Sequence, residues 1–70
     1  MTKAEFDKHI AYIDENIEDV KKELKSIDEM LEKETDNDRK QWLIDAKERG
    51  YSEIRELQDT KRRFTEDFGQ

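Results

Sequence analysis

The sequence predicts an all-α fold, an antiparallel hairpin of two long helices. One observation is composition: the 70 residues include no proline and only two glycines, and 49% are charged, as in long solvated helices. Another is the spacing of apolar residues in the first half, alternately four and three apart, which is the repeat of a coiled-coil seam. The residues of this seam are Phe6, Ile10, Ile13, Ile17, Val20, Leu24, Ile27 and Leu31.

The third observation is that the seam has a mirror image in the second half of the chain. Each residue has a counterpart such that the two residue numbers sum to 74: Phe68, Phe64, Lys61, Leu57, Ile54, Gly50, Lys47 and Leu43. Five of these are large and apolar, one is glycine, and the stems of the two lysines can lie along apolar surface. In heptad notation every pair joins an a position with a d position, as antiparallel packing requires.

The first helix is expected over about residues 3–34. Thr2 can cap it, because Glu5 follows three residues later in a capping-box pattern. Residues 35–38 are polar and suit a turn. Asp38 is expected to cap the second helix, which covers about residues 39–68, with Gly69 just past its end. The chain, residues 1–70, is then a single helical-hairpin domain.

Gly50 lies inside the predicted second helix, where glycine costs about 1 kcal/mol of stability relative to alanine. We expect the helix to continue, with the missing side chain letting Leu24 pack close to the backbone. The alternative is a break near Gly50, with Ser52 capping a third helix.

A lone hairpin leaves one side of its apolar seam open to water. Ordering about 65 residues costs on the order of 100 kcal/mol, and a two-helix pair buries its few apolar side chains only in part. We therefore expect self-association into a homodimeric four-helix bundle or coiled coil, or docking onto another protein.

Several apolar or aromatic residues, most of them large, lie outside the seam and form the candidate partner-binding set. Most belong to the loop end of the hairpin, on both edges, and aromatic residues are enriched among interface hot spots. The set consists of Tyr12, Met30, Trp42, Ile44, Ala46 and Tyr51. The alternative is that these residues pack within a homodimer or fold over the hairpin end.

The net charge of −6 is uneven, because residues 1–38 carry −7 and residues 39–70 carry +1. An acidic surface repels nucleic acid and anionic membranes. One face of the first helix is strongly acidic, and its residues are Asp14, Glu15, Glu18, Asp19, Glu29 and Glu32. This face is either solvated or a mimic of a phosphate array. The basic cluster Lys61-Arg62-Arg63 is expected to serve helix stability, with an ion pair between Asp59 and Arg63.

The residues of most catalytic and metal sites are missing. There is no cysteine and only one histidine, His9, and no glycine-rich phosphate loop or credible nucleophile–histidine–acid set is present. We expect no catalysis, no cofactor and no metal. No segment resembles a signal peptide or a membrane span, so we expect a cytoplasmic protein.

These observations favour a small non-enzymatic protein that acts by binding another protein, as a regulator, inhibitor or adaptor of bacterial or phage type. One alternative is an acidic decoy that blocks the nucleic-acid site of a basic protein. Another is a structural subunit of an assembly.

Overall fold

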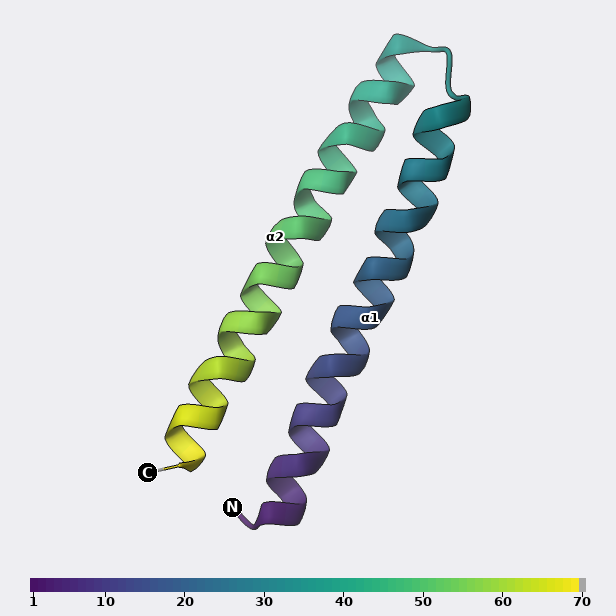
Figure 1. Cartoon of the computed structure of the whole chain (residues 1–70). Helices are drawn as coiled ribbons and strands as arrows, with labels where there is room; N and C mark the ends of the chain where they lie inside the picture. Colours follow the sequence, from purple (N-terminus) through teal and green to yellow (C-terminus); the bar gives the residue numbers. More distant parts are fainter. Residues whose placement is uncertain (70) are drawn as a thin grey trace.

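Two antiparallel helices joined by a short connection make up nearly all of the computed structural model, which describes residues 1–69 (Figure 1). Helix α1 covers Lys3–Lys33 and helix α2 covers Asn37–Phe68. They lie side by side along a rod of 51 × 15 × 11 Å, and the first and last described residues lie at the same end (Figure 1). The predicted all-α hairpin is confirmed.

The helices pack in the register that the mirrored seam predicts. A Cβ atom built on Gly50 would lie 2.7 Å from Cδ2 of Leu24, so these two residues face each other across the seam. At the open end of the hairpin the rings of Phe6 and Phe68 stack, with centroids 4.2 Å apart. Both pairs have residue numbers that sum to 74, although they lie at different heights along the rod.

Helix α2 is continuous through Gly50, as expected. The glycine permits a backbone approach that a larger residue would obstruct, because the space beside it is filled by the Leu24 side chain. The helix keeps its hydrogen bonds on both sides of Gly50, so Ser52 does not cap a third helix.

The start of α1 follows the prediction and the start of α2 does not. Thr2 caps α1, because its Oγ1 accepts a hydrogen bond from the Glu5 backbone N–H at 3.1 Å. The prediction that Asp38 caps α2 is wrong: the cap is Asp36, whose Oδ1 accepts from the N–H groups of Asp38 at 2.8 Å and Arg39 at 3.4 Å. Since Asp36 has extended backbone angles, the helix begins two residues earlier than expected.

The core is small and lies in the middle and the loop half of the rod. The buried hydrophobic residues are Ile17, Val20, Leu24 and Leu43. Most other seam residues are half-buried, and Phe68 is exposed. Phe64 contacts two neighbours at the open end, the Phe6 ring with centroids 5.4 Å apart and the His9 ring at the same distance. One layer of two helices leaves these side chains partly in water.

Candidate functional site

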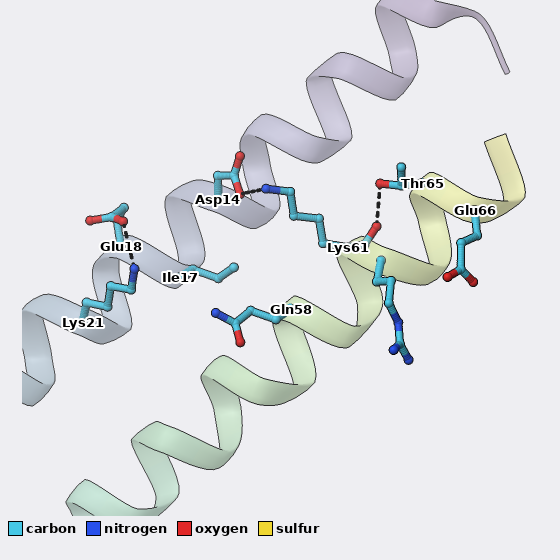
Figure 2. A pocket seen from close by; sticks show the side chains of 9 residues that line it. Asp14, Ile17, Glu18, Lys21, Gln58, Lys61, Thr65 and Glu66 are labelled. Carbon is cyan, nitrogen blue, oxygen red and sulfur yellow. Dashed lines mark hydrogen bonds and ion pairs between the residues drawn. The ribbon is translucent and has the colours of Figure 1, made fainter. Parts of the chain in front are cut away.

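Both seam lysines are paired with aspartates of α1 on the same edge of the rod. Lys47 Nζ lies 2.6 Å from Asp28 Oδ1, and Lys61 Nζ lies 2.7 Å from Asp14 Oδ1 (Figure 2 shows the second pair). The two pairs repeat after fourteen residues, or two heptads, on each helix. The hydrogen bond to Asp28 raises the pKa of Lys47 above its ordinary value of 10.5. This edge of the seam is therefore closed by charge rather than by apolar contact.

A shallow hollow lies beside the Lys61–Asp14 pair, between α1 and α2 (Figure 2). Its charged and polar side chains interact mainly with their neighbours: Lys21 with Glu18 at 3.6 Å, and Thr65 with the Lys61 carbonyl at 2.8 Å. Arg62, also in the lining, pairs with Asp59 at 2.6 Å. The predicted pair between Asp59 and Arg63 is also present, at 2.9 Å. We assign this hollow no function, because its cations already have carboxylate partners.

A different groove opens at the loop end, which we call the loop-end groove. It is lined by Met30, Lys33, Glu34, Arg39, Trp42 and Leu43 and has a volume of about 460 Å³. Leu43 is buried, whereas Trp42 is 63% exposed and Met30 is 48% exposed. The groove thus has an apolar floor and two large apolar side chains that remain mostly in water.

The side chains that line the loop-end groove carry a net charge of +1, from the cations Lys33 and Arg39 and the carboxylate Glu34. Its one carboxylate, Glu34, accepts hydrogen bonds through Oε1 from the backbone N–H groups of Thr35 at 3.2 Å and Asp36 at 3.1 Å. Lys33 and Arg39 form no ion pair with any of residues 1–69. The sequence pattern did not single out these two cations. The available signal was that Arg39 follows the polar turn directly, beside an exposed aromatic residue.

The structure divides the six predicted partner-binding residues among separate places. Met30 and Trp42 share the loop-end groove, and Ala46 is half-buried outside its lining. Ile44 is exposed, and Tyr51 lines another hollow, where its ring centroid lies 5.9 Å from Lys47 Nζ. Tyr12 is exposed but lies eighteen residues before Met30 on α1, which is roughly 27 Å along a helix. These residues therefore do not form one continuous patch.

The predicted acidic face is only partly free. Asp14 is bound to Lys61, and Glu18 pairs with Lys21. The remaining members are exposed on α1: Glu15, Asp19, Glu29 and Glu32. A continuous array of free carboxylates, which a nucleic-acid mimic would present, is thus interrupted at two of its six positions.

Within residues 1–69, no group of three potential metal-ligating side chains comes together. Neither of the two described helices has a stretch long and apolar enough to cross a membrane. Comparison with known proteins gives no further guidance, because no family model, curated protein or solved structure matches this chain. The loop-end groove remains the best candidate site on the described surface.

Proposed function

We propose that this protein is a non-enzymatic binding module that acts as a regulator, inhibitor or adaptor by contacting another protein through the loop-end groove. The observation that carries the proposal is the exposure of Trp42, at 63%, beside Met30 and above the buried side chain of Leu43. Tryptophan is among the residues most enriched in interface hot spots.

Folding of the hairpin does not need Trp42 in this position. The residue lies outside the seam, at a heptad position where a polar side chain would serve the helix equally well. Fully burying a large apolar side chain contributes about 1.5–3 kcal/mol. Because Trp42 is 63% exposed and Met30 is 48% exposed, a partner that covers both would gain about half to two-thirds of this for each residue. The exposed pair is thus a source of binding energy that the isolated chain leaves unused.

We also propose that the hairpin forms a homodimer through its half-buried seam. The chain exposes 5744 Å², whereas a folded monomer of its mass, 8.5 kDa, typically exposes about 4,650 Å². The excess of roughly 1,100 Å² exceeds the approximately 800 Å² that each partner buries in a standard interface. Two hairpins joined along the seam would form a four-helix bundle.

A photo-crosslinking experiment tests the binding site. A benzophenone amino acid is placed at Met30 in one protein and at Tyr12 in another, and both are exposed to extract of the native host. We expect specific adducts only from position 30, and at least a tenfold loss of them when Trp42→Ala is added. The control is Tyr12→Ala, because Tyr12 is equally exposed, at 65%, but far from the groove.

Circular dichroism verifies that every variant keeps its helicity. Adducts that form equally from both positions, or that persist in Trp42→Ala, would refute the proposed site. Sedimentation equilibrium over a wide range of concentrations tests the homodimer separately. A monomer at every concentration would contradict the dimer without affecting the loop-end groove.

A further inference from the structure

The charge of the loop-end groove is opposite to that of the chain. The protein carries a net charge of −6, yet the groove presents two cations, Lys33 and Arg39, while its carboxylate Glu34 is engaged by two backbone N–H groups. An exposed apolar surface flanked by unpaired cations complements a segment that is both apolar and acidic.

Arg39 has an unfavourable position within its own helix. It lies in the first turn of α2, three residues after the cap Asp36, where the partial positive charge of the helix N-terminus favours anions and disfavours cations. By contrast, Lys33 lies in the last turn of α1, where a cation is favourable. A carboxylate of a binding partner would offset the unfavourable position of Arg39, because it can accept two parallel hydrogen bonds from the guanidinium group.

A second copy of the chain is a poor occupant for this groove. A twofold contact places the same surface of both subunits face to face. Lys33 and Arg39 of one copy would then approach the same two cations of the other, and juxtaposed like charges oppose association. The occupant must therefore supply negative charge as well as an apolar side chain.

We propose that the loop-end groove binds an acidic peptide segment of a partner protein. One large apolar side chain enters between Met30 and Trp42, above Leu43, and carboxylates on either side of it pair with Lys33 and Arg39. This inference rests on the proposed function, because it names the chemistry of the segment that the groove binds.

Selection from a random peptide library on the immobilised full chain tests the proposal. Enriched peptides are labelled with fluorescein, and their dissociation constants are measured by anisotropy. We expect an aromatic or large aliphatic residue flanked by aspartate or glutamate. The double charge reversal Lys33→Glu/Arg39→Glu should weaken binding at least tenfold. The two substitutions interact oppositely with the helix dipoles. Lys33→Glu places an anion in the last turn of α1, where it is unfavourable, and Arg39→Glu places one in the first turn of α2, where it is favourable.

The matched control is Lys22→Glu/Lys25→Glu, which makes the same change in net charge on exposed positions of α1 away from the groove. We expect it to alter binding less than twofold. Peptides that lose binding in Trp42→Ala but bind equally well to the Lys33/Arg39 reversal would overturn this inference and leave the proposed function standing.

A library that yields no binder sensitive to Trp42→Ala would overturn the inference and contradict the proposed function as well. Self-association that is abolished by Trp42→Ala would show a second copy in the groove and would also overturn the inference. Sedimentation of wild type and Trp42→Ala distinguishes this last result from the others.

Discussion

Replacing Gly50 with alanine measures how closely the two helices approach each other at Leu24. A Cβ atom at position 50 would lie 2.7 Å from Leu24 Cδ2 and 3.1 Å from Leu24 Cγ, and carbon atoms prefer separations of about 3.5–4.0 Å. Leu24 is only 6% exposed, so its side chain has little room to move away. The substitution therefore adds an atom to a space that is already filled.

Two opposing effects decide the change in the free energy of unfolding. Alanine improves helix propensity over glycine by about 1 kcal/mol, whereas inserting a carbon atom into a filled core costs about 1–3 kcal/mol. Taking the middle of that range, Gly50→Ala should destabilise the protein by about 1 kcal/mol. In a Leu24→Ala background the obstructing atoms are gone, and the same substitution should stabilise by about 1 kcal/mol.

A double-mutant cycle of wild type, both single variants and the double variant isolates this coupling, which we expect to be about 2 kcal/mol. Urea unfolding is followed by circular dichroism at one protein concentration, since association would change the apparent stability. Trimethylamine N-oxide in all samples keeps the Leu24→Ala baseline measurable. If Gly50→Ala stabilises both backgrounds equally, the close approach of the helices is refuted.

Two further predictions concern the cap and the ion pairs. Asp36→Ala should lower the free energy of unfolding by about 1 kcal/mol, because it removes the acceptor for two backbone N–H groups. Asp38→Ala should lower it by about half as much, because it removes only a favourable charge near the helix N-terminus. Thermal melts that show a larger loss of stability for Asp38→Ala than for Asp36→Ala would contradict the assignment of Asp36 as the cap. The raised pKa of Lys47 contributes stability that is complete below its ordinary pKa and is lost as the pH rises through the folded-state value. Urea melts between about pH 9 and about pH 12 should therefore show a smaller alkaline loss for Lys47→Met than for wild type, and equal losses would argue against the pair with Asp28.

The register could be predicted because every position along the seam supplies the same information. The counterparts Phe6 and Phe68 are sixty-two positions apart and the counterparts Leu24 and Gly50 are twenty-six positions apart. A shift of one residue in either helix would move all such pairs off the seam at once. Thr2 was predictable as a cap for a similar reason, since Glu5 stands at the required spacing. The register and the cap of α1 could both be predicted because more than one residue at a fixed spacing indicates the same structure.

The cap of α2 could not be assigned in this way. Asp36 and Asp38 are both good cap residues, and the choice depends on where the backbone leaves its extended conformation. That depends on how Glu34 folds back onto the N–H groups of Thr35 and Asp36. The loop geometry therefore decided what residue preference alone left open.

The candidate site was predictable only in part. Met30 and Trp42 stood out because they are large and lie off the seam, and both line the loop-end groove. The role of Arg39 was not visible, because a lone arginine in a highly charged chain is not informative until its neighbours are known. Similarly, the repeat predicts Lys61 on the seam but does not reveal Asp14, on the acidic face of α1, as its partner.

The three-residue connection between α1 and α2 makes the interhelical contacts nested along the chain. Leu31 and Leu43 are only twelve positions apart in the sequence, and each successive pair of seam residues encloses the previous one. Closing the loop once brings the next pair within reach, so later contacts require little additional loss of chain entropy. Topologies of this kind fold rapidly, because most contacts form by extension from those already made. The hairpin should therefore close from its loop end, so that the loop-end groove is assembled before the phenylalanines at the open end meet.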